Sequence, residues 1–380
     1  MKHNILIIGG GIAGLSAAIA VQKAGYSAVV YEAAESLRPL GAGLGLSANA
    51  MRAFAKLGIR DEVIARGRLL DGFSILDEKG RVISHTDSRA LSKKFGPDNF
   101  TIHRAALHEV LLAAVAPNMI RTGKKCLAIN SGANNRRIRF ADGDSVEADY
   151  VIVADGIHSP LRQQLVPDSA PRYAGYTCWR GLVSNRQLNI QQSMEIWGSK
   201  GRFGLVPLAN DQLYWFATTN SPANNLRYKN YSAADLRVHF TGYPAAVSAA
   251  LDAWPESHVI WNDIADIKPL DRFAYDNVLL IGDAAHASTP NMGQGACQAA
   301  EDAAVLYEEL CIHADIENAF RHFEKRRLDR TRFIIRQSAR IGKMGQITNP
   351  FIAGLRNRLM RALPAAIKEK QLARIYQTDF

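Results

Sequence analysis

The sequence is poor in cysteine. Its 380 residues include only Cys126, Cys178, Cys297 and Cys311, which lie far apart and form no C-x-x-C pair. This spacing indicates neither a zinc site built from cysteine pairs nor a disulfide framework. Because scattered, unpaired thiols are typical of a reducing compartment, we expect a cytoplasmic protein.

Long apolar runs are also absent. No run approaches the roughly 20 residues that a membrane-spanning helix requires, so we expect a soluble chain with no transmembrane segment. Residues 1–4 lead directly into a short apolar run that no small-residue cleavage site follows, which predicts no signal peptide. A length of 380 residues predicts two or three domains, each with its own core.

Acidic residues are scarce at one end of the chain. The formal net charge is +10, and from Arg321 onward fifteen Lys and Arg face only four Asp and Glu. No nucleic-acid-binding motif accompanies this charge, so we expect no nucleic-acid partner. Two explanations stay open: C-terminal helices whose basic faces point to solvent, or a peripheral contact with anionic lipid or an acidic partner.

Residues 4–32 contain the most informative motif. An apolar run at Ile5–Ile8 leads into Gly9, Gly11 and Gly14 at G-x-G-x-x-G spacing, and an alanine-rich helical pattern follows. In such a unit the first glycine allows the tight turn, the second lets a pyrophosphate approach the backbone, and the third lets helix and strand pack closely. The stretch therefore predicts a dinucleotide-binding βαβ unit.

Residues on either side of the glycines complete this predicted site. The helix begins near Ile12 and Ala13, where unpaired N–H groups and the positive end of the helix dipole would face the phosphates. Glu32 follows a second apolar run, Ala28–Tyr31, at the position where a carboxylate can hold ribose hydroxyls. The motif alone does not distinguish FAD from NAD.

Two later apolar runs end in short acidic turns. Residues 150–154 lead into Asp155 in the pattern D-G-x-x-S-x-x-R, and residues 278–281 lead into Gly282 and Asp283. Open α/β sheets bind ligands at the carboxyl ends of their strands, so both turns are candidate ligand sites.

A glycine-bearing loop and a helix follow the second acidic turn. The loop P-N-M-G-Q-G spans residues 290–295, and the helix begins near Ala296, so its N-terminus is a second anion site. His286 has no His, Cys or carboxylate at ligand spacing. We therefore expect a packed or capping histidine, and no metal site.

The middle of the chain has a different pattern of aromatic, polar and apolar residues. Residues 172–266 contain aromatic-rich strands, residues 124–147 alternate polar and apolar side chains around a turn, and residues 70–95 look like short strands. Alternation of this kind indicates antiparallel sheets. The sequence therefore predicts a second, mainly antiparallel domain whose sheet forms one wall of a pocket.

Together these blocks resemble the FAD-dependent aromatic-ring hydroxylases, which are single-component flavoprotein monooxygenases. The resemblance rests on the ordered trio G-G-G-I-A-G with Glu32, then D-G-I-H-S-P-L-R, then G-D-A-A-H-A-S-T-P-N-M-G-Q-G. The segment G-Y-T-C-W-R-G at residues 175–181 is similar to the salicylate-hydroxylase-like branch, which includes urate hydroxylase and zeaxanthin epoxidase. The resemblance covers most of the chain, roughly residues 1–340.

The resemblance implies an α/β fold with three parts. They are a discontinuous Rossmann-like FAD-binding domain, an inserted, mainly antiparallel β-sheet substrate domain, and C-terminal helices. We expect residues 1–70, 100–170 and 267–340 in the first, residues 71–99 and 171–266 in the second, and residues 341–380 in the third.

The resemblance also implies FAD as the bound dinucleotide and NADPH or NADH as co-substrate. Arg104 and Asp155 would contact the middle of FAD, Asp283 its ribityl chain, and the loop at 290–295 its isoalloxazine ring. The predicted cofactor contacts are Gly9, Gly11, Ile12, Ala13, Gly14, Glu32, Arg38, Gly43, Arg104, Asp155, Gly282, Asp283, Pro290, Gly293, Gln294 and Gly295.

The implied reaction is hydroxylation of an aromatic or heteroaromatic small molecule by O2. Reduced flavin would form a C4a-hydroperoxide that transfers one oxygen atom, while the protein positions the substrate and excludes water. Pro290 and Gly293 would lie beside the reacting ring. Arg202 and Tyr214 match residues that contact the substrate in urate-hydroxylating relatives. An Arg202 that faces the pocket would favour an anionic or heteroaromatic substrate, and the alternative is a surface or inter-strand arginine.

Several functions stay open on this evidence. Epoxidation and drug-inactivating hydroxylation use the same flavin chemistry, and a flavin-binding sensor without turnover is a non-catalytic alternative. The absence of a W-x-W-x-I-P segment argues against halogenation. The sequence leaves the substrate, the choice between NADH and NADPH, and the choice between monomer and homodimer undecided.

Overall fold

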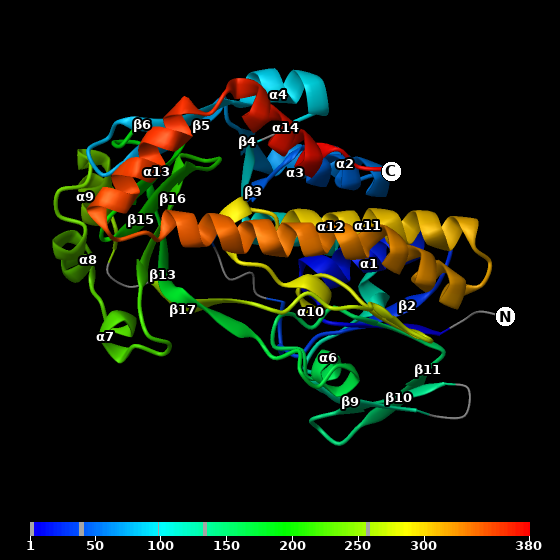
Figure 1. The fold of residues 1–380 in the computed structure, drawn as a ribbon. Coiled ribbons are helices and arrows are strands. Elements are labelled where there is room, and N and C mark those ends of the chain that lie inside the picture. Colours follow the sequence, from blue (N-terminus) through cyan, green and yellow to red (C-terminus); the bar gives the residue numbers. More distant parts are fainter. Residues whose placement is uncertain (1–3, 38–41, 98, 132–134, 256–258) are drawn as a thin grey trace.

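The computed structural model describes residues 4–37, 42–97, 99–131, 135–255 and 259–380. Two large sheets organise this part of the chain, a mainly parallel sheet on the right of Figure 1 and a mainly antiparallel sheet on the left. None of the described helices combines the length and the apolar character that crossing a bilayer requires.

The first sheet is built around the predicted dinucleotide-binding unit. Its strands run parallel except for the pair at one edge. The strand order is β18 (Ala274–Tyr275), β19 (Val278–Leu280), β12 (Tyr150–Val153), β1 (Ile5–Ile8), β2 (Ala28–Tyr31) and β8 (Ile120–Arg121). The central strands are continuous apolar runs because both faces of the sheet are covered.

Helices cover one face of this sheet, and a small antiparallel sheet with α6 covers the other (Figure 1). The covering helices are α1 (Ile12–Lys23), α2 (Ala48–Leu57), α5 (Arg104–Ala113), α11 (Gly295–Ile312) and α12 (Ile316–Gly345). The alanine-rich first half of α11 is buried and packs against α1, α2 and α12. On the opposite face lie α6 (Pro160–Leu165), β9 (Cys126–Ser131), β10 (Arg136–Phe140) and β11 (Ser145–Ala148).

The second sheet has seven strands, and all neighbours run antiparallel except β14 and β5. Its order is β17 (Ile260–Asp266), β13 (Arg172–Ser184), β16 (Gln212–Asn220), β15 (Gly201–Pro207), β14 (Ser193–Gly198), β5 (Gly72–Asp77) and β6 (Val82–Asp87). Buried aromatics, among them Trp179 and Trp215, pack one face against α7 (Leu226–Lys229), α8 (Ala233–His239) and α9 (Ala245–Asp252). The other face carries Tyr214 and Arg202 and meets β3 (Gly43–Leu46) and the loop before α11.

The remaining elements connect or flank these layers. They are β3 (Gly43–Leu46), β7 (Phe100–His103) and β4 (Gly67–Leu69), which form a small sheet, together with α3 (Arg60–Arg66), α4 (Ser88–Phe95), η1 (Pro117–Met119), α10 (Asp283–His286), η2 (Pro290–Met292), α13 (Pro350–Ala362) and α14 (Ala365–Tyr376).

The predicted α/β fold is confirmed, with a parallel sheet, an antiparallel sheet and C-terminal helices. The prediction of strands throughout residues 70–95 is wrong for its last part, which forms α4. The side chain of Asp87 caps this helix by accepting hydrogen bonds from Arg89 N and Ala90 N, and Leu91 and Phe95 bury its apolar side. The domain boundaries given above stay a prediction.

Candidate functional site

The glycine turn after β1 is held by very close backbone contacts. Gly9 has φ +109°, and a Cβ there would lie 2.4 Å from Ala154 O. A Cβ on Gly14 would lie 1.8 Å from Gly9 O, whereas a Cβ on Gly11 would meet nothing within 4 Å. Two glycines thus serve packing, and the third leaves open the space into which the N-terminus of α1 points.

Glu32 braces this turn. Its Oε2 accepts a hydrogen bond from Gly10 N at 2.6 Å, and its Oε1 accepts one from Ala34 N at 2.8 Å. On the other side of the turn, His108 Nε2 of α5 lies 2.8 Å from Gly10 O. His108 was not predicted, because its contact joins residues far apart in the sequence.

Asp155 stands at the carboxyl end of β12, beside the glycine turn. Both of its carboxylate oxygens are buried, and no donor in the described part of the chain hydrogen-bonds to them. Burial raises the pKa of Asp155 to about 6, against the opposing influence of Ser159 and Arg162. Because buried polar atoms normally have partners, this carboxylate is suited to accept a hydrogen bond from a ligand.

Arg162 connects the two acidic turns. Its guanidinium is buried and donates to Ile157 O at 2.6 Å and to Ser169 O at 3.1 Å. A longer bond of 3.4 Å reaches Ala284 O, next to the second turn. This arginine therefore has a structural role, and the spacing D-G-x-x-S-x-x-R reflects it.

Asp283 is the first residue of α10, and its side chain is exposed. The protein packed around its carboxyl group raises the pKa of Asp283, while the nearby side chains of His286 and Arg104 oppose this rise. Arg104 begins α5 and is itself exposed. The fold therefore brings Asp283 near Arg104, so two of the predicted cofactor contacts lie in the same region.

The loop before α11 borders the same region. Gly293 has φ +62°, and a Cβ on Gly293 or Gly295 would meet nothing within 4 Å. Pro290 is exposed. The side chain of Gln294 is buried and bonded to Asn49 at 2.9 Å, so only its backbone is available to a ligand.

A buried charged network supports this loop from behind. Asp302 Oδ2 accepts hydrogen bonds from Gly282 N at 2.8 Å and from His286 Nε2 at 2.6 Å, and Asp302 Oδ1 accepts one from Arg327 Nε at 2.7 Å. Burial alone would raise the pKa of Asp302, but His286 and Arg327 hold it below its usual value. His286 is thus a packed histidine, as predicted. The role of Arg327 was not predicted, because in a segment rich in Lys and Arg nothing in the sequence distinguishes a buried arginine from an exposed one.

The side of the second sheet that points away from α7, α8 and α9 meets this region through Tyr214. A Cβ on Gly43 of β3 would lie 2.6 Å from the Tyr214 ring, so the strand and the sheet meet here. Burial raises the pKa of Tyr214, and nearby Arg180 opposes the rise. Arg180 is half-buried and donates to Asn262 Oδ1. Strand alternation places Arg180 on the same face as Tyr214, since Arg180 pairs with Phe216, two residues from Tyr214.

Arg202 lies on the same face but is not exposed. Its side chain is 3% exposed and forms an ion pair of 3.0 Å with Glu195 on β14. Nη2 donates to Asn291 Oδ1 at 2.6 Å, and the guanidinium lies 5.5 Å from the Tyr176 ring centroid. Of the two alternatives predicted for Arg202, these contacts match the inter-strand arginine. Its predicted role as a substrate contact stays a prediction.

The comparisons with known proteins agree with this geometry. The family model described as "FAD binding domain" matches residues 2–335, a range that includes every predicted cofactor contact. Aurachin C monooxygenase/isomerase of Stigmatella aurantiaca is 36% identical over 361 residues, which are 95% of this chain and 94% of that protein. The chain belongs to the FAD-dependent aromatic hydroxylases.

Two further comparisons place this hydroxylase more closely. The 2-heptyl-3-hydroxy-4(1H)-quinolone synthase of Pseudomonas aeruginosa strain PAO1 is 30% identical over 378 residues, 98% of this chain and 97% of that one. The structure of Klebsiella pneumoniae HpxO complexed with FAD and uric acid has a TM-score of 0.91 at 28% identity, covering 98% of this chain and 96% of that one. This hydroxylase is an oxidoreductase that uses FAD, with NADH or NADPH as co-substrate.

The residues of the site fit FAD. Asp155 offers buried acceptor oxygens that have no donor in the described part of the chain. Gly11, Gly293 and Gly295 leave open space where a side chain would otherwise stand. Arg38, another predicted contact, lies outside the described residues.

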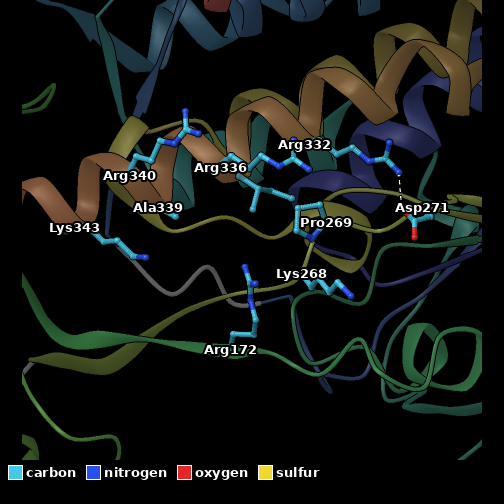
Figure 2. A pocket seen from close by; sticks show the side chains of 10 residues that line it. Arg172, Lys268, Pro269, Asp271, Arg332, Arg336, Ala339, Arg340 and Lys343 are labelled. Atoms are coloured by element: carbon cyan, nitrogen blue, oxygen red, sulfur yellow. Dashed lines mark hydrogen bonds and ion pairs between the residues drawn. The ribbon is translucent and has the colours of Figure 1, made fainter.

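The hydroxylase has a hollow of about 460 Å³ whose lining is strongly basic. In Figure 2, Arg336 and Lys343 extend from α12 on one side, and Lys268 lies on the opposite side. Arg332 pairs with Asp271 at 2.8 Å, and the cleft also contains Arg172. Within the described chain, no ion pair reaches Lys268, Arg336 or Lys343. We refer to this hollow as the basic cleft.

One group of side chains in the described residues has the spacing of metal ligands, although we predicted no metal site. Ligand atoms of Glu309, His313 and His322 lie within 4.8 Å of one another. Arg326 Nη1 already donates to Glu309 Oε1 at 2.8 Å, and its charge opposes a cation. The group lies around the C-terminal end of α11, at the opposite end of that helix from the glycine-bearing loop.

Proposed function

We propose that this hydroxylase acts on a neutral heteroaromatic ketone with an apolar substituent, of the quinolone type, and adds one hydroxyl oxygen from O2. The observation that carries the proposal is the ion pair between Arg202 and Glu195. Because the pair neutralises the charge of Arg202 inside the wall, this arginine is poorly placed to attract an anion such as urate.

The rest of the sheet face supports a largely apolar ring. Leu182, Val206 and Phe216 are partly exposed, and their register puts them on the same face as Tyr214. Arg180 has no carboxylate partner in the described chain and can donate to a ring carbonyl. Such a wall suits a flat, neutral ring system with one strong acceptor.

The names of two relatives support the same class. One relative is an aurachin C monooxygenase/isomerase and another a 2-heptyl-3-hydroxy-4(1H)-quinolone synthase, at 36% and 30% identity over nearly the whole chain. A heptyl-bearing quinolone combines a carbonyl-containing ring with an apolar chain.

We further propose how the chain holds FAD. The open face of Gly11 and the N-terminus of α1 would receive the diphosphate, and Asp155, Arg104 and Asp283 would contact the middle and the ribityl chain. The N–H groups at the start of α11 would face the flavin ring and stabilise negative charge on it. FAD supplies the oxygen-activating chemistry when bound, and the protein orients the substrate and excludes water.

We propose the basic cleft as the place where the phosphates of NADPH or NADH bind. Lys268, Arg336 and Lys343 offer cations that no described acidic residue neutralises, and phosphates are bound by such groups. The cleft is also close to the flavin loop. Ser338, which precedes the cleft residue Ala339 on α12, is hydrogen-bonded to Thr289 at 3.1 Å, and Thr289 directly precedes the loop.

Substrate-stimulated oxidation of NADPH and NADH tests the proposed substrate class. The flavin-loaded protein should oxidise either nucleotide faster with a 2-alkyl-4-quinolone than with urate or salicylate, and the product should be heavier by one oxygen atom. Stimulation by urate alone would favour an anionic purine and contradict the proposal.

A further inference from the structure

Helix α13 carries its large apolar side chains outward. The exposed fractions of Phe351, Ile352, Leu355 and Leu359 are 84%, 50%, 53% and 62%. Their spacing of one, four and eight residues from Phe351 places all four on one side of the helix. A helix that only covers the core of a monomer would point this side inward.

The inward side of α13 is polar and firmly held. Arg356 is buried, and its Nη1 donates to Met344 O at 2.6 Å while its guanidinium lies 5.0 Å from the Trp197 ring centroid. Arg361 Nη2 lies 2.9 Å from Asp77 Oδ2 of β5. These contacts fix the rotation of α13 about its axis. The apolar side therefore points outward because the polar side is held against the protein.

Exposed apolar side chains also occur before and after the helix in the sequence. Met344 before α13, and Leu363 and Ile367 after it, are 41%, 39% and 45% exposed. We define these three residues together with Phe351, Ile352, Leu355 and Leu359 as the apolar face. The four side chains on one side of α13 form an exposed apolar patch, and such a patch marks an interaction surface.

The segment of the chain that carries the apolar face is basic. No Asp or Glu occurs between Asp329 and Glu369, a stretch that contains nine Lys and Arg. Lys343 and Arg358 flank the apolar face and are exposed. A symmetric contact between two copies would bring these like charges together, whereas an anionic surface would neutralise them.

We propose that the apolar face docks the hydroxylase on an anionic phospholipid bilayer. α13 would lie in the plane of the interface, with Phe351 and its neighbours at the boundary between headgroups and acyl chains, and with Arg358 on the anionic headgroups. A basic helix with one apolar side is suited to binding on a membrane rather than crossing it.

This docking surface adjoins the wall of the proposed substrate site. Gln346, between α12 and α13, donates through Nε2 to Thr218 Oγ1 of β16 at 3.0 Å. A Cβ on Gly345 would lie 2.7 Å from the Cδ of Arg202. A substrate dissolved in the bilayer would thus meet the enzyme close to that wall. The delivery of a bilayer-dissolved substrate to this wall rests on the proposed function, whereas the docking itself does not.

Vesicle flotation of the flavin-loaded protein tests the proposal. Binding should be strong to vesicles of phosphatidylcholine with phosphatidylglycerol, weak to phosphatidylcholine alone, and weaker at high salt. The triple variant Phe351→Ser, Leu355→Ser, Leu359→Ser should bind anionic vesicles at least about tenfold more weakly. Val238→Ser on α8 is the matched control, because Val238 is 75% exposed but lies outside the apolar face, and its binding should equal that of the parent protein.

Three results would overturn the proposal. They are no preference for anionic vesicles, unchanged binding of a triple variant that keeps its flavin absorbance, and a dimer that the triple variant dissociates without vesicle binding by the parent. The last result would assign the apolar face to a second copy of the chain. Because flotation needs no turnover, its failure would leave the proposed quinolone substrate untouched, and a wrong substrate class would leave the docking untouched.

Discussion

Arg202 on β15 and Glu195 on β14 form a buried ion pair in which 3.0 Å separates Nη1 from Oε1. The same guanidinium reaches Asn291 Oδ1 at 2.6 Å, so it ties the antiparallel sheet to the loop that precedes α11. Its position between two strands and its neutralised charge make it an architectural residue of the wall. This relationship is why we propose a neutral substrate.

Replacement of Glu195 should show how much this ion pair contributes to stability. Glu195→Gln leaves Arg202 as a buried cation without its counter-charge, which we expect to lower the free energy of unfolding by about 3 kcal/mol or more. Urea unfolding of the flavin-loaded protein measures this loss. The freed charge should also raise kcat/KM for urate relative to a 2-alkyl-4-quinolone. Glu62→Gln, at an exposed acid of α3, should change neither quantity, and an unchanged stability of Glu195→Gln would contradict the ion pair.

The two glycines of the first turn should respond differently to alanine. Gly14→Ala places a Cβ 1.8 Å from Gly9 O, so we expect the flavin-free protein itself to be destabilised. Gly11→Ala meets no protein atom within 4 Å, so it should leave that stability unchanged but weaken FAD binding at least about tenfold, because the methyl group would enter the space of the diphosphate. Thermal unfolding without FAD and FAD titration separate the two effects. If Gly11→Ala and the parent protein bind FAD with equal affinity, the diphosphate does not bind at this position.

Asp155 should make the stability of the flavin-free protein depend on pH. Burial raises its pKa to about 6 from an ordinary value of 3.8. Between these two pH values the folded state binds more protons than the unfolded state, so stability falls as pH rises through this window and levels off above it. Asp155→Asn should therefore raise the free energy of unfolding by up to about 3 kcal/mol at pH 7 and by much less at pH 4. Urea unfolding at both pH values measures the difference, with exposed Asp168→Asn as control. An equal gain at both pH values would show that the carboxyl group is not the cause.

The basic cleft should affect the nicotinamide co-substrate and not the flavin. We expect the double variant Lys268→Ala, Arg336→Ala to raise the KM for NADPH severalfold, because two unpaired cations near its phosphates are lost. FAD affinity should stay at the parent value. Lys79→Ala, at an exposed lysine away from the cleft, should leave KM unchanged. A double variant with unaltered KM for both NADPH and NADH would place the phosphates elsewhere.

Local geometry explains what the sequence could predict. The turn at Gly9, the acid at Glu32 and the acidic turns at Asp155 and Asp283 each follow a buried apolar strand, so a short stretch of residues specifies both the strand and the group at its end. The strand-like appearance of residues 88–95 misled because Asp87 caps a helix there, and this short segment contains too few turns for its periodicity to be clear.

Contacts between distant segments could not be predicted in this way. The bond of His108 to Gly10, the pair of Arg327 and Asp302, and the pair of Arg202 and Glu195 depend on how helices and strands pack. Arg327 and Arg202 look like ordinary surface bases in sequence, since nothing local indicates that each will be buried against a carboxylate. The outward apolar side of α13 was hidden similarly, because periodicity reveals an apolar stripe but not the direction it faces.

The most direct test is turnover of a 2-alkyl-4-quinolone with NADPH in the presence of isotopically labelled O2, followed by mass spectrometry of the product. We predict a hydroxylated quinolone that carries one labelled oxygen atom, formed only by the flavin-loaded protein. NADPH oxidation that yields hydrogen peroxide and unmodified quinolone, together with efficient labelling of urate or salicylate, would contradict the proposed substrate class.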